Sequence, residues 1–264
     1  MTETARWMVG AALAVATALG ARAAGALGTS GAGAAAIMGT VAVAAGWDWG
    51  AVLVAYFVSS SALSRIGRAE RDRRTAGRIE KGGPRDATQV AANGGMFAIA
   101  AAGFLLSANP AWQVVGAAAL AASAADTWAT EIGTLSRSTP RSILTGRPVP
   151  AGTSGGVTAL GLMAAFAGAA FVASAVSLCG WGRETVNAAM IGGVAGSVLD
   201  SVLGASLQAR RWCGTCGMDT EQPVHWCGTR TDIRGGLRWL DNDGVNAAST
   251  IGGALAGVLV AARL

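Results

Sequence analysis

Polar residues cluster at five places in or beside apolar stretches of the chain, where ionisable side chains are costly and usually serve a function. In the first cluster, Asp86, Gln89 and Asn93 fall at positions i, i+3 and i+7, so they share one face if the segment is helical. That face offers oxygen atoms for a cation or contacts for a phosphate. The alternative is a helix N-terminal cap followed by hydrogen bonds between helices.

Carboxylates form the second and third clusters and suggest a site for a hard cation. Asp126 and Glu131 follow an alanine-rich run, and Asp200 lies deep within another apolar stretch. Because Mg²⁺ prefers oxygen ligands, these carboxylates are candidates to hold it. Asp126 and Glu131 lie about 140° apart on a helix, so they can serve one site only if that helix ends or is surrounded there. An ion pair with a nearby arginine is the alternative.

The fourth cluster comprises Asn242, Asp243 and Asn246, which follow Asp241 within about one helical turn. An acidic residue at a helix start is ordinary capping. Two asparagines and a second aspartate exceed what capping needs. We therefore expect Asp243 to join Asp126 and Asp200 as a Mg²⁺ ligand.

The fifth cluster is a glycine-rich turn that leads into an apolar segment, and its residues are Gly152, Thr153, Ser154, Gly155 and Gly156. Free backbone N–H groups at a helix start, together with the helix dipole, favour anions. Arg141 and Arg147, upstream, could supply positive charge. The alternative is a helix cap by Thr153 or Ser154, with glycine for close packing.

A sixth feature lies in a polar stretch near the C-terminal end. Cys213 and Cys216 have the spacing Cys-x-x-Cys, and His225 and Cys227 follow. Three thiols and one imidazole suit a four-ligand zinc site, although the second spacing is not that of a standard zinc finger. Free or redox-active thiols are the alternative.

Hydropathy indicates the elements that position these groups. Of 264 residues, 52% are hydrophobic and only 13% are charged, against about 25% charged in a soluble domain. The sequence predicts one all-α integral-membrane domain over residues 1–264, a polytopic transmembrane helix bundle of about eight spans, with seven as the alternative. The expected spans are 7–26, 31–46, 49–63, 89–108, 111–133, 155–179, 185–208 and 242–262.

Three long loops, 64–88, 134–154 and 209–241, carry most of the arginines, and consecutive loops are separated by two spans. All three should therefore face the same side, which the positive-inside rule identifies as the cytoplasm. The net charge of +5 is explained by these loops, so no nucleic acid is expected as a partner. We predict a multi-pass protein of the cell membrane, with its active site at the cytoplasmic face.

The five clusters, in their order along the chain over residues 83–250, resemble an integral-membrane family defined as a domain of unknown function. That family includes the plant phytyl-phosphate kinase of tocopherol synthesis and a mammalian transmembrane relative. The matching segments are Gly-Pro-Arg-Asp-Ala-x-Gln-Val-x-Ala-Asn-Gly-Gly from Gly83, Asp-Thr-Trp-Ala-x-Glu from Asp126, Gly-Thr-Ser-Gly-Gly-Val from Gly152, Gly-Ser-x-x-Asp-Ser from Gly196, and Asn-Asp-x-Val-Asn from Asn242.

The resemblance implies a Mg²⁺-dependent kinase that transfers a phosphoryl group from a nucleoside triphosphate, CTP by preference, to an isoprenyl (phytyl-like) monophosphate. Asp126, Glu131, Asp200 and Asp243 would be catalytic, and the other residues of the five clusters would bind the substrates. A CTP-dependent lipid nucleotidyltransferase and a membrane transporter are the alternatives. Membrane lipids are further partners, and a homodimer is left open.

Overall fold

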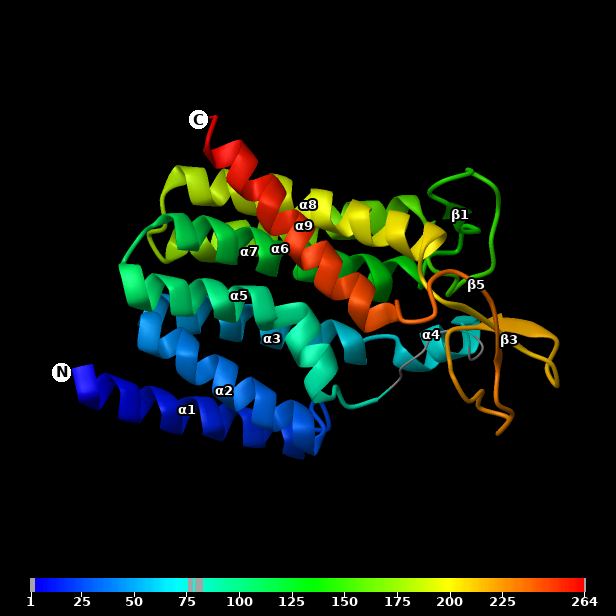
Figure 1. The fold of residues 1–264 in the computed structure, drawn as a ribbon, viewed down its shortest axis with the longest axis horizontal. Coiled ribbons are helices and arrows are strands. Elements are labelled where there is room, and N and C mark those ends of the chain that lie inside the picture. Colours follow the sequence, from blue (N-terminus) through cyan, green and yellow to red (C-terminus); the bar gives the residue numbers. More distant parts are fainter. Residues whose placement is uncertain (1–2, 76–77, 79–82, 264) are drawn as a thin grey trace.

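The computed structural model describes residues 3–75, 78 and 83–263. Within these ranges eight long helices run back and forth along one direction, and one short helix, α4 (Arg68–Thr75), follows the third of them (Figure 1). The long helices are α1 (Glu3–Ala23), α2 (Thr29–Ala45), α3 (Trp47–Arg65), α5 (Ala87–Ser107), α6 (Ala111–Gly133), α7 (Ala159–Leu178), α8 (Arg183–Ser206) and α9 (Asn242–Ala261). They coincide in order with the eight predicted spans, and their ends differ by a few residues.

Length and composition identify four described helices that can cross a membrane, namely α5, α7, α8 and α9. A fifth span results if α3 and α4, which meet at an angle of 66°, are counted together. The other long helices do not meet the same test: α1 and α2 are apolar over fewer residues, and α6 has long alanine runs that the other helices bury. The chain is thus a mostly helical, multi-pass membrane protein, and the predicted count of eight spans is not confirmed.

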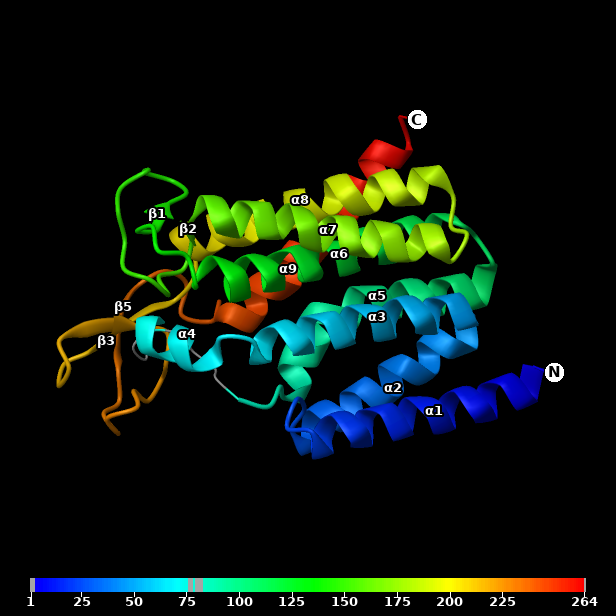
Figure 2. The ribbon, with the colours of Figure 1, turned by 180° about the vertical axis from the view of Figure 1, so that it is seen from behind.

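The described parts of the three long loops gather at one end of the bundle, with α4 and the strands, while the first and last described residues lie at the opposite end (Figures 1 and 2). Two small antiparallel sheets form there, a departure from the all-α prediction. One pairs β1 (Arg141–Ser142) with β2 (Gly156–Val157). The other has the order β4-β3-β5, from β3 (Arg210–Cys213), β4 (Met218–Thr220) and β5 (Asp232–Gly235). The sequence prediction treated these loops as irregular and missed strands of two to four residues.

Small residues bring α6, α8 and α9 into close contact. A Cβ atom at Gly196 of α8 would meet the side chain of Ala122 on α6 and the backbone oxygen of Ser249 on α9. One turn further from the loop end, Gly192 is similarly confined by Gly253. Because these positions carry no side chain, the three helix backbones approach closely. The next turn of α6 and α8 toward the loops carries Asp126 and Asp200, so close packing sets the distance between their carboxylates.

Candidate active site

The carboxyl groups of Asp126 and Asp200 are within hydrogen-bonding reach of each other at the loop end of α6 and α8. Asp200 also has a side-chain hydrogen bond with Ser249 of α9. Two carboxylates in contact repel unless a proton or a cation lies between them. The structure therefore brings together two of the three aspartates that the sequence nominated as metal ligands.

A cation fits this pair. The Oδ2 atom of Asp200 is buried and has no hydrogen-bond partner among the described residues. A buried carboxylate oxygen without a donor is costly to desolvate, and a bound cation removes that cost. Mg²⁺ takes oxygen ligands and commonly uses one or two carboxylates together with substrate phosphates. The two carboxylates thus form a half-complete coordination shell that phosphate oxygens could close.

The polar residues in the first turn of α9 point in different directions: some line the polar cavity, and one is buried away from it. Asn242 and Asn246 line the polar cavity beside Asp126. Asp243 is buried and lines none of the cavities described below. Asp241, immediately before the helix, accepts a hydrogen bond from the backbone N–H of Gly244 at 2.9 Å and forms the N-cap. The structure therefore brings the two asparagines to the cavity wall but does not place Asp243 on it.

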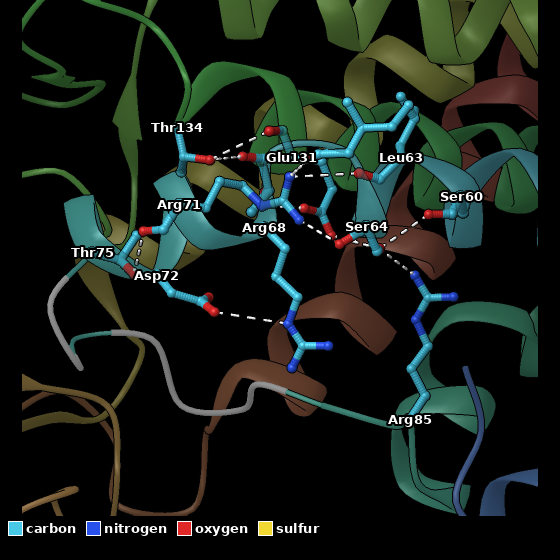
Figure 3. Close-up of polar contacts among 12 residues, drawn as sticks. Ser60, Leu63, Ser64, Arg68, Arg71, Asp72, Thr75, Arg85, Glu131 and Thr134 are labelled. Carbon is cyan, nitrogen blue, oxygen red and sulfur yellow. Dashed lines mark hydrogen bonds and ion pairs between the residues drawn. The ribbon is translucent and has the colours of Figure 1, made fainter. Parts of the chain in front are cut away.

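Glu131 belongs to a second polar network, which joins α6 to α3 and α4 (Figure 3). Its Oε2 lies 2.7 Å from Nε of Arg71, and its Oε1 accepts a hydrogen bond from the hydroxyl of Ser64 at 2.6 Å. Arg71 is only 8% exposed. It also donates to the carbonyl oxygens of Leu63, Ser64 and Ile66. The last carbonyls of a helix lack the usual intrahelical partners, so Arg71 caps the end of α3 while neutralising Glu131.

Arg85 extends the same network from the other side (Figure 3). Its guanidinium group donates to the hydroxyls of Ser61 at 3.3 Å and Ser64 at 3.1 Å. Its main chain is held by the segment between α1 and α2, since its N–H donates to Ala26 and its carbonyl accepts from Gly28. Among the described residues, the side-chain partners of Arg85 are neutral hydroxyls. Arg85 therefore keeps a positive charge that is available to an anion.

The first cluster matches the alternative left open by its sequence. Asp86 and Gln89 form a capping box at the start of α5, with hydrogen bonds of 2.9 and 3.0 Å. Asn93 accepts from the hydroxyl of Ser123 on α6 at 2.8 Å, and that hydroxyl lies 2.7 Å from the hydroxyl of Tyr56 on α3. Gln89 and Asn93 nevertheless line two cavities. They combine a structural role with a position on the cavity wall.

The glycine-rich turn lies against α8 rather than at a helix start. β2 and Thr158 intervene, and Thr158 caps α7 by accepting from the N–H of Gly161 at 3.0 Å. The alternative in which Thr153 or Ser154 caps this helix is therefore wrong, because the helix begins at Ala159. For the same reason, the helix dipole that was expected to favour an anion does not start at this turn. Gly155 has a φ of +70°, and a Cβ there would collide with Ala205 and with the backbone of Ser201. Close packing on α8 is thus one reason for this glycine.

The two arginines upstream of the turn, Arg141 and Arg147, lie outside the described cavities. Arg141 is exposed and donates to the carbonyl of Gly146 in its own loop at 2.8 Å. Arg147 is also exposed. The arginines that line the polar cavity come from elsewhere, and they are Arg65, Arg68, Arg71, Arg73 and Arg85.

Three cavities meet around these groups. The first, of about 410 Å³, is bounded mostly by apolar side chains of α1, α2, α3 and α5. The second, of about 320 Å³, lies between the glycine-rich turn, α6 and α8. The third, of about 750 Å³, contains the arginines and opens among α3, α4, α6 and α9. The first and third cavities share Arg85, Gln89, Asn93 and Thr127. The second and third share Asp126, Thr130, Thr134 and Asn242.

Sequence reasoning missed several residues of this wall. Arg71 and Arg85 were used only to predict that their loop faces the cytoplasm. Nothing in the sequence distinguishes one arginine from the others in a basic loop. Thr127 and Ser197 stand beside nominated aspartates in the resembling segments and line the cavities. Arg85 could have been found, since it lies between a Gly-Pro turn and the capping Asp86.

The four residues of the sixth feature come together outside the bundle. One ligand atom from each of Cys213, Cys216, His225 and Cys227 lies within 4.8 Å of the others. The hydroxyl of Thr229 and the imidazole of His225 lower the pKa of Cys227 to about 6. Hydrogen bonding to Cys227 raises the pKa of Cys216 to about 11. The cluster lies in the loops outside the helix bundle and contains neither Asp126 nor Asp200.

Known proteins place the chain in a family. The family described as Integral membrane protein DUF92 matches residues 12–254. Protein PGR of Arabidopsis thaliana is 30% identical over 238 residues, which cover 80% of this chain and 81% of the plant protein. Uncharacterized membrane proteins of Methanocaldococcus jannaschii and Synechocystis are 29% and 32% identical, covering 79% and 64% of this chain and 74% and 66% of their own lengths. No solved structure matches it. The chain therefore belongs to the family Integral membrane protein DUF92.

Proposed function

We propose that this protein is a membrane-embedded, Mg²⁺-dependent kinase that transfers the terminal phosphoryl group of a nucleoside triphosphate, CTP by preference, to an isoprenyl monophosphate. One observation carries the proposal: an apolar cavity shares wall residues, Arg85 among them, with an arginine-lined cavity, and that cavity shares Asp126 with the cavity of the glycine-rich turn. A lipid phosphate has an apolar tail and a charged head. Its binding site must therefore change from apolar side chains to cationic ones where the tail meets the phosphate.

The acceptor lipid would occupy the first cavity, which is apolar, and the adjoining part of the third, which contains the arginines. Its isoprenyl chain would occupy the cavity among α1, α2, α3 and α5, where Leu27 and Met38 contribute apolar surface. Its phosphate would meet Arg85 at the boundary with the polar cavity. Guanidinium groups bind phosphate oxygens through charge-assisted hydrogen bonds and remain charged at all physiological pH values.

The nucleotide would bind on the far side of the carboxylate pair. The cavity beside the glycine-rich turn is lined by Ser154, Asp126 and Asp200. Its triphosphate would extend toward the third cavity through the shared wall of Thr130, Thr134 and Asn242. This arrangement would direct the two phosphate groups toward each other.

Transfer at this junction requires positioning and neutralisation of charge more than covalent chemistry by the protein. An oxygen of the lipid phosphate attacks the γ-phosphorus, the bond from that phosphorus to the β,γ-bridging oxygen breaks, and the nucleoside diphosphate leaves. Mg²⁺ held by Asp126 and Asp200 would supply Lewis-acid stabilisation of the phosphate oxygens. Arg85 would neutralise part of the developing charge, while the Arg71–Glu131 pair, with Ser64, would hold the cavity wall beside it. A lipid phosphate is already an anion, so no general base is needed.

The same end of the bundle would face the cytoplasm of a cell-membrane protein. It carries α4 and the three arginine-containing loops, and the links at the other end are short (Figure 1). The positive-inside rule assigns such an end to the cytoplasm, where nucleoside triphosphates are present.

Isotope placement tests the reaction. Purified protein in detergent would be incubated with Mg²⁺, an isoprenyl monophosphate panel, and CTP or ATP labelled at either the α- or the γ-phosphorus. The expected product is a lipid diphosphate labelled only from the γ-position, with release of the nucleoside diphosphate. Label transferred from the α-position with release of pyrophosphate would instead identify a nucleotidyltransferase. Absence of any labelled lipid across the panel would reject both lipid-modifying reactions and favour a transporter.

A further inference from the structure

Two similar turns bring the cysteines and the histidine together at the outer end of the sheet formed by β3, β4 and β5. In the first, Cys213 ends β3, and its carbonyl accepts a hydrogen bond from the N–H of Gly217 at 2.9 Å. In the second, the carbonyl of His225 accepts from the N–H of Gly228 at 2.8 Å. Gly217 and Gly228 have φ values of +63° and +83°, which residues with a Cβ rarely adopt. Each turn thus folds back sharply just after the residues that carry ligand atoms.

The side chains converge with the spacing of a single metal ion. The sulfur atoms of Cys213 and Cys227 are 3.5 Å apart, and Nδ1 of His225 is 3.2 Å from the sulfur of Cys227. All four cysteines of the chain are unpaired, so no disulfide accounts for this approach. Cys213 and His225 are almost completely buried. Three sulfur atoms and one imidazole nitrogen make a four-ligand set that suits tetrahedral zinc.

We propose that Cys213, Cys216, His225 and Cys227 bind one structural zinc ion that fastens the loop between β4 and β5 over the candidate active site. Binding releases the thiol protons, because zinc takes thiolate ligands. The ion has no open coordination position and no part in phosphoryl transfer.

The loop that the zinc ion would hold carries residues that line or contact the candidate active site. Glu221 and Gln222 lie in the chain between the ligands Cys216 and His225, so the ion closes a loop around them. The hydroxyl of Ser154, in the glycine-rich turn, donates to Glu221. Gln222 and Trp226 line the arginine-containing cavity. The fastened segment is therefore a wall of two cavities.

Metal content and loop protection test the proposal independently of any kinase activity. Full-length protein would be purified in detergent under reducing conditions without chelator. The expected zinc content is about one equivalent per chain. Cys216→Ser, whose side chain is exposed, and His225→Ala should each lose most of it. Cys179→Ser is the matched control, since Cys179 lies at the opposite end of the bundle, and it should keep a full equivalent.

Trypsin gives the second readout, because Arg230, Arg234 and Arg238 lie in or beside the fastened loop. Removal of zinc with a strong chelator should speed cleavage at these arginines by about 10-fold or more, and added Zn²⁺ should restore the protection. Wild-type protein without zinc that takes up none when Zn²⁺ is added would overturn the proposal. So would a Cys213–Cys227 disulfide in the reduced preparation, or cleavage that is unchanged by metal removal.

Discussion

The two halves of the bundle pack in different ways. Around α6, α8 and α9, glycine and alanine face backbone atoms of the neighbouring helices, and a Cβ at Gly196 or Gly253 has no room. Among α1, α2, α3 and α5, the side chains leave an apolar cavity of about 410 Å³. The first half fixes the positions of carboxylates, whereas the second leaves room for a flexible chain. The difference suggests that one half holds the reacting groups and the other accommodates the lipid tail.

Removing a carboxylate from the close-packed half should have the largest effect. Asp126→Asn and Asp200→Asn should each reduce turnover by about 100-fold or more, because an amide cannot replace an anionic Mg²⁺ ligand. The protein should remain folded, since Asn has nearly the same shape. Asp219→Asn, an exposed residue of β4, is the control and should keep normal turnover. Near-normal turnover of either site variant would remove that aspartate from the site.

Arg85 tests the boundary between the two halves. Arg85→Ala should raise the Michaelis constant for the lipid phosphate by about 10- to 100-fold, the equivalent of a lost hydrogen bond to a charged group. Arg85→Lys should recover part of this because it keeps the charge. Arg22→Ala, an exposed arginine in the last turn of α1, serves as the control. Equal Michaelis constants for Arg85→Ala and wild type would assign the residue to loop packing alone.

Matched glycines test the packing difference itself. Gly196→Ala should lower stability by about 1–3 kcal/mol, because the added methyl group meets Ala122 and the backbone of α9. Gly95→Ala on α5 has open space around its Cβ position and should leave stability unchanged or raise it, since alanine favours helix. Thermal unfolding in detergent would measure both. Equal melting temperatures for the two variants would contradict the inference that α6, α8 and α9 pack more closely than the other helices.

Filling the apolar cavity should have a smaller, chain-length-dependent effect. Ala35 lines this cavity from α2, and Ala35→Phe should raise the Michaelis constant for a long isoprenyl phosphate by roughly 10-fold through steric overlap. Short isoprenyl phosphates should be little affected. Ile37→Phe provides the control, because Ile37 is 70% exposed on the outer face of the same helix. If Ala35→Phe affects both chain lengths equally, the tail does not lie there.

The smallest effect is expected at Arg141. Its side chain contacts its own loop and lines no described cavity. Arg141→Ala should therefore change the Michaelis constants by less than about 2-fold and leave the melting temperature nearly unchanged. Steady-state kinetics with both substrates would measure this. A large rise in the constant for the nucleotide would show that this loop closes onto the site during the reaction.

Apolar stretches of about 20 residues predicted the long helices well, since hydropathy reports burial in lipid or in the bundle. Hydropathy did not separate two kinds of helix. Some are long and apolar enough to cross a membrane, whereas the alanine-rich surface of α6 is covered by other helices. The strands in the loops were missed because each is two to four residues long and arises from pairing across the chain.

The site was predictable in part. Asp126, Asp200 and Asn242 could be nominated because polar residues in apolar segments are costly. The sequence could not show that Asp243 lies off the cavity wall, because three adjacent polar residues point in different directions once a helix begins. The expectation that the glycine-rich turn leads directly into a helix failed for a related reason: β2, which separates that turn from α7, depends on pairing with β1.

The central claim is that both phosphate groups meet at the carboxylate pair. It can be tested directly with Mn²⁺ in place of Mg²⁺ in a complex of the protein with an isoprenyl monophosphate and a non-hydrolysable nucleoside triphosphate. Paramagnetic relaxation of the ³¹P signals would then be measured. In the wild-type complex, both the lipid phosphate and the γ-phosphate should broaden strongly, and neither should do so in Asp126→Asn or Asp200→Asn. Broadening of the nucleotide signals alone, or broadening that persists in both variants, would contradict the account.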